Sequence, residues 1–237
     1  KKFKKFIGSD SCVAVNSGTA ALNLAVSLLD IKDKEVILPS LSFVSTANAV
    51  LINGGIPVFV EIDPQTLCIN SASIDEAITK KTKIILPVHF GGLPCELDEI
   101  KKIAKENNCF VIEDAAHAVG SKYNSQKIGK HSFATCFSFH PVKNLAMPTG
   151  GLISINHNNH EKIEKRLKSL RWCGISNRKS TSYDVNELGN NYYMNEISAA
   201  IGLVQLEKIN KLTKIRQNIA KRYFNEIMID EKMPFDN

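Results

Sequence analysis

The sequence contains no long hydrophobic segment: none of its apolar runs approaches the ~18 residues that a membrane-spanning helix needs. Internal repeats and low-complexity tracts are also missing. The composition, 43% hydrophobic and 23% charged with 13 Gly and 8 Pro, is close to the globular average. It therefore excludes disordered, collagen-like and disulfide-scaffold proteins. At roughly 150 residues per domain, 237 residues predict one to two domains.

Metal-binding and disulfide patterns are missing as well. The six cysteines form no CxxC pair and show no zinc-ligand spacing. Cys12, Cys109 and Cys136 lie inside apolar runs, where cysteine usually acts as a small buried hydrophobe. His157 and His160 form an HxxH, but the two asparagines between them indicate a turn. We therefore predict a reduced, cytoplasmic protein without a metal site.

The net charge of +6 is concentrated in two segments. The first five residues carry four lysines, and residues 207–222 carry six basic side chains against one glutamate, so the rest of the chain has a net charge of −3. A mildly acidic body argues against a nucleic-acid partner, and the 207–222 run is typical of a solvated helix face. The initial KKFKKF resembles the start of a signal peptide, but Gly8-Ser9-Asp10 follows instead of an apolar stretch.

Short β-rich runs alternate with helical segments along the chain. Seven near-continuous apolar runs predict strands buried on both faces, as in a parallel sheet: residues 12–15, 36–38, 58–60, 84–87, 110–113, 135–138 and 152–155. Helices are expected between and after them, at residues 20–29, 46–52, 74–80, 97–106 and 160–172. This alternation predicts an α/β fold with crossover connections.

Two segments break the alternation. Residues 139–148 connect two predicted strands without a helix, and an irregular connection in a regular fold is where function tends to lie. After Ser176 the sequence becomes polar and predicts a long loop. From Asn195 a long helix is expected to end near Ile227, and Pro234 stops whatever follows.

Three motifs could carry chemistry. Ser17-Gly18-Thr19 follows a predicted strand and opens a helix, which favours either an ordinary helix cap or an anion site. Asp114 ends a predicted buried strand, where a carboxylate could serve a metal, a ribose, a protonated ring nitrogen or a helix cap. Lys143 is either a snorkelling surface lysine or, if desolvated, a nucleophilic amine. No GxGxxG or GKS/T motif is present.

The order of these motifs is more specific than any one of them. The chain contains, in succession, SGTAAL, PSLSFVSTANAV, GGIPVFVEID, PVHFGG, IEDAAHAVG, FSFHPVK and GG. This series resembles the DegT/DnrJ/EryC1/StrS family of pyridoxal-phosphate (PLP) sugar aminotransferases of fold type I, from about Asp10 to about Tyr223. The resemblance implies a three-layer α/β/α PLP-binding large domain over residues 8–206, with a mostly parallel sheet of about seven strands. Residues 207–237 would then form a linker helix to a C-terminal small domain that is absent, so truncation at both ends is expected.

The resemblance also implies the roles of individual residues. Lys143 matches the lysine that forms the internal aldimine with PLP, and Asp114 matches the acid that pairs with the pyridine nitrogen. Asn191 matches an asparagine that reaches the phosphate of the neighbouring subunit, which implies a homodimer with shared active sites. The remaining cofactor-binding positions are the phosphate ligands Gly18, Thr19 and Ser138, the ring-stacking Phe43, and His117 beside the ring. His89 and His140 lie in matching motifs without an assigned role.

The sequence departs from the family pattern next to the lysine. The usual TTGEGG reads Ala146-Met147-Pro148-Thr149-Gly150-Gly151, and Tyr193 and Cys173 replace a usual Arg and His. We expect these changes to affect substrate contacts more than PLP binding. The implied reaction moves an amino group from an amino acid, with glutamate as the expected donor, to a keto-sugar nucleotide. Two alternatives stay open: a non-catalytic fragment of such an enzyme, and a PLP-dependent sugar dehydratase, against which Lys143 argues because dehydratases carry histidine there.

Overall fold

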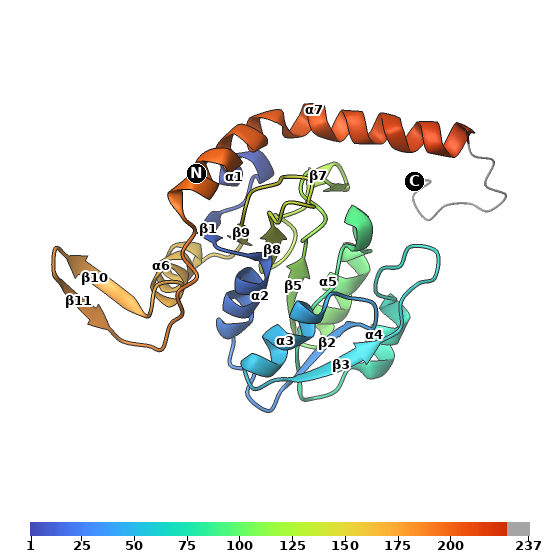
Figure 1. Ribbon diagram of the computed structural model, residues 1–237. Coiled ribbons are helices and arrows are strands. Elements are labelled where there is room, and N and C mark those ends of the chain that lie inside the picture. Colours follow the sequence, from blue (N-terminus) through green and yellow to red (C-terminus); the bar gives the residue numbers. More distant parts are fainter. Residues whose placement is uncertain (227–237) are drawn as a thin grey trace.

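A seven-stranded sheet forms the centre of the protein (Figure 1). The computed structural model describes residues 1–226. In spatial order the strands are β1 (Ser11–Val15), β9 (Gly151–Ile155), β8 (Ala134–Ser138), β5 (Phe110–Asp114), β4 (Thr82–Ile85), β2 (Glu35–Pro39) and β3 (Ile56–Val60). All neighbours are parallel except β9, which runs antiparallel to β1 and β8. The mostly parallel seven-stranded sheet predicted from the apolar runs is confirmed.

Helices cover both faces of this sheet. One face is covered by α2 (Gly18–Ser27), α3 (Val44–Ile52) and α6 (His160–Leu170), and the other by α1 (Lys2–Ile7), α4 (Ser71–Ala77), α5 (Leu97–Glu106) and α7 (Glu196–Glu226). The strands alternate between the two: Val36 and Leu38 of β2 pack with α2 and α3, whereas Ile37 packs with α4 and α5. This is the three-layer α/β/α arrangement that the sequence predicted.

The long helix α7 begins where the sequence predicted. The side chain of Asn195 accepts a hydrogen bond from the Ser198 N–H at 2.8 Å and so caps the first turn. Its early turns pack on the body, and every residue from 214 to 226 is exposed. The predicted boundary between residues 206 and 207 falls inside this helix, and the two-part division stays a prediction. The predicted end near Ile227 and the stop at Pro234 lie outside the described residues.

The initial KKFKKF is a helix, α1, that the sequence pattern did not predict. Phe3 and Ile7 lie one turn apart, so both face the body and are buried. The ring of Phe3 packs edge-on against Phe137 at 5.2 Å and Phe139 at 5.4 Å between centroids. A six-residue helix is too short to show a clear hydrophobic period, so its stability depends on this tertiary packing.

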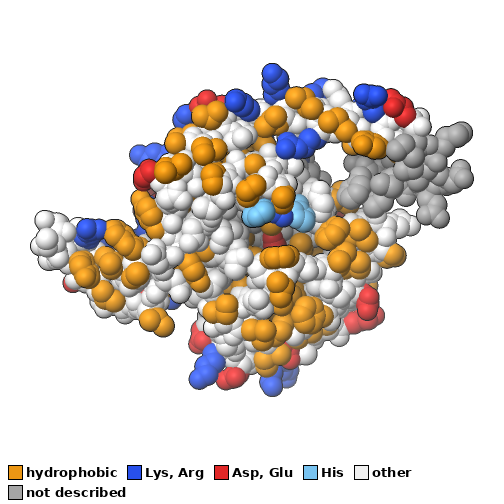
Figure 2. Space-filling view, in the orientation of Figure 1, with side chains coloured by type: hydrophobic (Ala, Val, Ile, Leu, Met, Phe, Trp, Pro, Cys, Tyr) orange, Lys and Arg blue, Asp and Glu red, His pale blue; other side chains and the backbone are white. Residues whose placement is uncertain are grey.

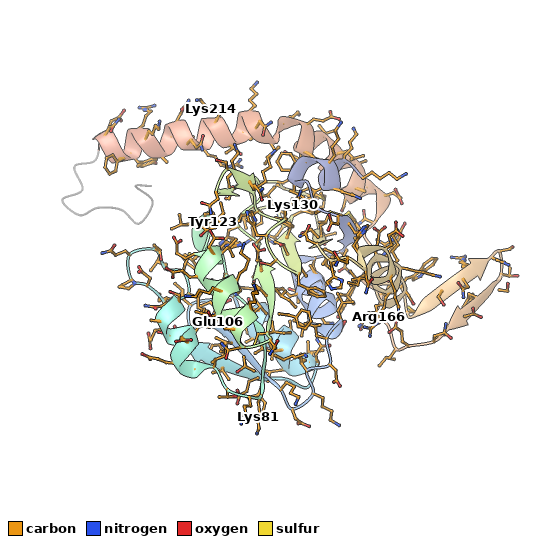
Figure 3. The ribbon with its side chains drawn as sticks, turned by 180° about the vertical axis from the view of Figure 1, so that it is seen from behind. Lys81, Glu106, Tyr123, Lys130, Arg166 and Lys214 are labelled. Atoms are coloured by element: carbon orange, nitrogen blue, oxygen red, sulfur yellow. The ribbon has the colours of Figure 1, made fainter. Side chains whose placement is uncertain are left out.

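The long loop predicted after Ser176 is wrong in part, because β10 (Ile175–Lys179) and β11 (Ser182–Val185) form an antiparallel hairpin that projects from the body (Figure 1). Its residues are nearly all exposed, so no buried face left an alternating pattern in the sequence. At its base, Arg166 of α6 donates a hydrogen bond to Glu187 at 3.0 Å; Figure 3 shows Arg166 on the hairpin side of the molecule.

Smaller elements complete the described chain: the short helix η1 (Phe90–Gly92) and the two-residue strands β6 (Lys122–Tyr123) and β7 (Gln126–Lys127). The six cysteines are free; Cys136 is buried as predicted, whereas Cys12 and Cys109 are only half-buried. Within residues 1–226, no helix combines the length and the apolar character needed to cross a membrane.

Candidate active site

The carboxyl ends of five strands meet at one edge of the sheet, and the segments that follow them surround a cavity of about 330 Å³. These strands are β1, β2, β4, β5 and β8, which all run in the same direction, and such an edge is where open α/β sheets bind ligands. Figure 2 shows histidine, basic and acidic side chains close together in a central hollow of this face. Seven of the eight predicted site residues line it: Gly18, Thr19, Phe43, Asp114, His117, Ser138 and Lys143.

Asp114 places a carboxylate at the end of β5, where it is only 4% exposed. The Thr46 hydroxyl donates a hydrogen bond to it at 2.9 Å, and the Ala116 N–H donates another at 3.1 Å. Ser42 in turn donates to Thr46 at 2.7 Å. Burial raises the pKa of Asp114 above its ordinary value, and the two hydrogen bonds oppose that rise because they favour the charged form.

Lys143 and His117 face the same cavity as Asp114. Burial lowers the pKa of Lys143, against the attraction of the Asp114 charge. Burial and the Lys143 charge together lower the pKa of His117. The Gly91 N–H donates to Nδ1 of His117 at 3.3 Å, so neutral His117 carries its proton on Nε2. The site therefore combines an amine that loses its proton more easily than usual with a buried acid.

The start of α2 forms another wall of the cavity. The Ser17 hydroxyl accepts the Ala20 N–H at 3.0 Å, so Ser17 is the N-cap and Gly18 is the first helical residue. A Cβ on Gly18 would lie 2.8 Å from the Cβ of Ser138, so only glycine lets these two segments approach so closely. The first N–H groups of a helix lack partners within it and, with the helix dipole, favour an anion.

Phe43 and Asn191 differ in their relation to the cavity. Phe43 lines it from the start of α3 and is 73% exposed. Asn191 is exposed and does not line it; its backbone carbonyl accepts a hydrogen bond from the Asn16 side chain at 3.3 Å. Asn16 also accepts a hydrogen bond from the hydroxyl of Thr149, which does line the cavity. In a single chain, Asn191 therefore lies behind the cavity wall.

His89 and Glu113 form a fully buried pair next to Asp114. Nδ1 of His89 accepts the Cys95 N–H at 3.1 Å, so its Nε2–H donates to Glu113 at 2.8 Å. Thr135 donates to the same carboxylate at 3.0 Å. Burial works to raise the pKa of Glu113, but the hydrogen bond that His89 donates, together with smaller contributions from other polar neighbours, outweighs it and lowers that pKa below its ordinary value. The backbone N–H of His89 also donates to the Asp114 carbonyl at 3.0 Å, which joins the ends of β4 and β5.

Sequence reasoning missed the residues that support the site rather than line it. Thr46 lies three residues after Phe43, in a motif in which only the aromatic side chain was assigned a role. Thr46 shares the first turn of α3 with another hydroxyl residue, Ser45, so nothing in the sequence distinguished it. His89 was noted in PVHFGG without a role, and its partner Glu113 directly precedes Asp114. Nothing in the sequence pairs a histidine with a carboxylate 24 residues away.

A buried acid, an amine with a lowered pKa and an open helix start lie together at the carboxyl edge of a parallel sheet, where α/β proteins bind ligands. The sequence model of the DegT/DnrJ/EryC1/StrS aminotransferase family matches residues 1–233. The chain belongs to this family. The family resemblance predicted from the motif order is confirmed.

Named relatives agree with this assignment. The spore coat polysaccharide biosynthesis protein SpsC of Bacillus subtilis is 40% identical over 232 residues, covering 94% of this chain and 59% of SpsC. PseC of Helicobacter pylori, an aminotransferase of pseudoaminic acid biosynthesis, is 30% identical with a TM-score of 0.89 over 94% of this chain and 60% of its own.

A third relative was solved in two cofactor forms. The putative sugar aminotransferase Spr1654 of Streptococcus pneumoniae has a TM-score of 0.88 in its PLP form, at 30% identity over 94% of this chain and 61% of its own. Its PMP form has a TM-score of 0.92 at 28% identity, over 96% and 63%. The chain spans about 60% of the length of the curated relatives it matches.

Proposed function

We propose that this chain binds pyridoxal phosphate in the cavity and acts as a sugar aminotransferase, with Lys143 as the amine that holds the cofactor. The observation that carries this proposal is one cavity that contains Lys143, with its lowered pKa, together with the buried carboxylate of Asp114. The PLP and PMP forms of Spr1654 support the choice of cofactor.

The residues present fit this cofactor in both charge and shape. The start of α2 and Ser138 suit a phosphate, because unpartnered N–H groups and a hydroxyl meet where Gly18 leaves room. Asp114 suits a protonated ring nitrogen, and Phe43 and His117 line the cavity between these two ends. Asn191 is proposed to complete the phosphate site of a partner subunit.

Each residue has a defined task in this proposal. Bound pyridoxal phosphate supplies a ring that accepts the electron pair released at the substrate carbon. Asp114, held by Thr46 and the Ala116 N–H, keeps a proton on the ring nitrogen through its negative charge. Lys143 takes a proton from the substrate at its Nζ and returns it to the product side, a task that its lowered pKa favours.

The proposed reaction converts an amino acid, glutamate, into its keto acid and a keto-sugar nucleotide into the amino sugar. The sugar is supported by SpsC and PseC, whose names refer to polysaccharide and pseudoaminic acid biosynthesis. The sugar dehydratase is disfavoured because position 143 is lysine. The second candidate is a chain that binds the cofactor without turnover, and the addition of glutamate in the experiment below distinguishes the two.

The proposal is tested by titrating the purified chain with pyridoxal phosphate and recording its visible absorbance, first alone and then with glutamate. We expect a visible band that Lys143→Ala abolishes. The matched control is Lys80→Ala, an exposed lysine on the surface, which should leave the band unchanged. Conversion of the band by glutamate supports aminotransfer.

Two results would count against parts of the proposal. A band that persists in Lys143→Ala would overturn the assignment of the lysine. A band in the unaltered chain that glutamate does not convert would exclude aminotransfer by this chain with that donor and favour cofactor binding without turnover.

We also propose that the enzyme acts as a homodimer in the cytoplasm. Exposed apolar side chains lie on α3 and β3, with Ile52 66% and Phe59 55% exposed, and Figure 2 shows hydrophobic side chains gathered on this face. Asn191 lies outside the cavity of its own chain, which is compatible with a role in the cavity of a partner subunit. Six free cysteines suit a reducing compartment. The domain division at residues 206/207 is likewise a proposal.

A further inference from the structure

The loop that carries Lys143 is fixed on both sides of that lysine. Residues 139–150 contain no helix or strand. The Phe139 N–H donates to the Gly150 carbonyl at 2.9 Å, and the Met147 N–H donates to the Phe139 carbonyl at 2.8 Å, which closes the loop at its base. The side chains of Phe139, Leu145 and Met147 are buried, whereas Lys143 is only half-buried. The Lys143 N–H donates to the His140 carbonyl at 2.8 Å, and the buried side chains hold the part of the loop that follows.

Met147 occupies a notch between the loop and α7 that two glycines leave open. A Cβ on Gly202 of α7 would lie 2.0 Å from Cε and 2.7 Å from Sδ of Met147. A Cβ on Gly150 would lie 2.9 Å from the same sulfur. Any side chain at either glycine would compete with Met147 for this space. The notch, defined by Gly150 and Gly202, thus joins the lysine loop to a helix more than fifty residues away in the sequence.

Helix conformation does not require the glycine at 202. Gly202 lies in the interior of α7 with ordinary negative φ, where alanine is the better helix former. The three atoms nearest to a Cβ at this position all belong to the Met147 side chain. Met147 also lies in the stretch 146–149, where this sequence departs from the family pattern. The notch therefore holds a residue from the stretch that departs from that pattern.

We propose that Met147, seated in the notch, is a positioning residue that holds the Lys143 amine over the cavity. This rests on the proposed function, in which Lys143 holds the cofactor. Without the anchor, residues 143–147 gain freedom and the amine moves toward water. Asp114 and His117 line the cavity from outside this loop, and His140 lies within it. Moving the amine into water removes both its burial and its attraction to Asp114, of which burial is the larger effect. Because burial lowers the pKa of Lys143, exposure raises it.

The test measures the reactivity of Lys143 in the cofactor-free chain, by competitive acetylation with acetic anhydride across a pH series and mass spectrometry of its peptide. The variants are Gly202→Ala, Met147→Ala, both together, and Met147→Leu, which preserves volume. The matched control is Gly55→Ala, whose Cβ would meet Ile31 at 2.6 Å, away from the cavity. Thermal unfolding and pyridoxal phosphate affinity are measured alongside.

We expect Gly202→Ala and Met147→Ala each to raise the apparent pKa of Lys143 toward its ordinary value. Cofactor affinity should fall by about tenfold or more because the amine is misplaced. The double variant should be no worse than Met147→Ala, because the added methyl enters vacated space, and Met147→Leu should resemble the unaltered chain. Gly55→Ala should lower the melting temperature without changing Lys143.

The proposal is overturned if Gly202→Ala lowers the melting temperature but leaves Lys143 as reactive as in Gly55→Ala, or if the two single effects add. If Gly202→Ala does not fold, Met147→Ala and Met147→Leu are compared instead: a Lys143 that is equally reactive in both overturns the proposal. The failure of the proposed function would look different: Lys143→Ala would keep the cofactor band, whereas the acetylation result does not depend on that cofactor.

Discussion

Thr46 acts on the site through a single hydroxyl group. It donates a hydrogen bond to the buried carboxylate of Asp114 at 2.9 Å and accepts one from Ser42 at 2.7 Å. The two hydroxyl groups therefore form a hydrogen-bonded chain that ends at the acid. A buried carboxylate is stable only where donors compensate its lost hydration. Charge at Asp114 therefore depends on Thr46, although Thr46 lies on a different element.

The first prediction concerns that hydroxyl. Thr46→Val keeps the shape and removes the donor, and a hydrogen bond to a charged group contributes about 1.5–3 kcal/mol. We expect pyridoxal phosphate to bind roughly 10–100-fold more weakly, as measured by absorbance titration. Thr46→Ser retains the hydroxyl and is the control. Unchanged affinity in Thr46→Val would show that Asp114 does not need this donor.

The second prediction concerns the pH dependence of the Glu113–His89 pair. The folded pKa of Glu113 is below its ordinary 4.5, so the ionised acid stabilises the fold above that pH, and this stability is lost as pH falls through the folded pKa. Glu113→Gln should lower the free energy of unfolding by about 1–3 kcal/mol at neutral pH. The difference in unfolding free energy between the unaltered chain and Glu113→Gln, measured by urea unfolding, should become smaller below pH 4.5. A difference independent of pH would contradict this reading.

At the scale of elements, α1 supports the segment that carries the lysine. Phe3 packs on Phe139, which is the first residue of the 139–150 loop and closes it through two backbone hydrogen bonds. Lys2 of the same helix forms an ion pair with Glu207 of α7 at 2.9 Å. Both side chains of that pair are exposed, so the apolar contact dominates.

The third prediction tests that contact. Phe3→Ala should lower the free energy of unfolding by about 3–5 kcal/mol, because it leaves a cavity beside two buried rings. Urea unfolding measures the loss. Tyr183→Ala, an exposed aromatic of the β10–β11 hairpin, should change stability by less than about 0.5 kcal/mol. Equal effects of the two changes would mean that α1 does not pack on the body in solution.

At the scale of the whole molecule, exposed apolar side chains lie on several elements, among them α7, the β10–β11 hairpin, and α3 with β3. Five of them, on α3 and β3, are at least 45% exposed: Val44, Leu51, Ile52, Ile56 and Phe59. Neighbouring apolar groups of this extent favour association, because burying them removes nonpolar surface from water. Since α3 begins at the cavity, association there would bring a second chain to the site.

The fourth prediction is that the chain sediments as a dimer. Ile52→Asp places a charge in the apolar face of α3 and should shift the population to monomer in analytical ultracentrifugation. Asn48→Asp adds the same charge at an exposed polar position of the same helix and should leave the dimer intact. A monomer in the unaltered chain would contradict the proposed shared site.

Sequence reasoning located most of the fold because buried parallel strands leave continuous apolar runs. It located Asp114 and Lys143 because each ends or follows such a run, and parallel strands end at a common edge. It missed α1 and the β10–β11 hairpin. The first is too short to show a period, and the second buries no face that would impose one.

The sequence by itself determined the family, the layered fold and the order in which the site residues occur, because these depend on local periodicity and on motifs within single segments. Only the tertiary structure decided which residues support the site. Thr46 meets Asp114 across 68 residues, and Met147 fits the space at Gly202 across more than fifty. Hydrogen bonds and close packing act over a few ångströms in space, and no local pattern records which distant segments will meet.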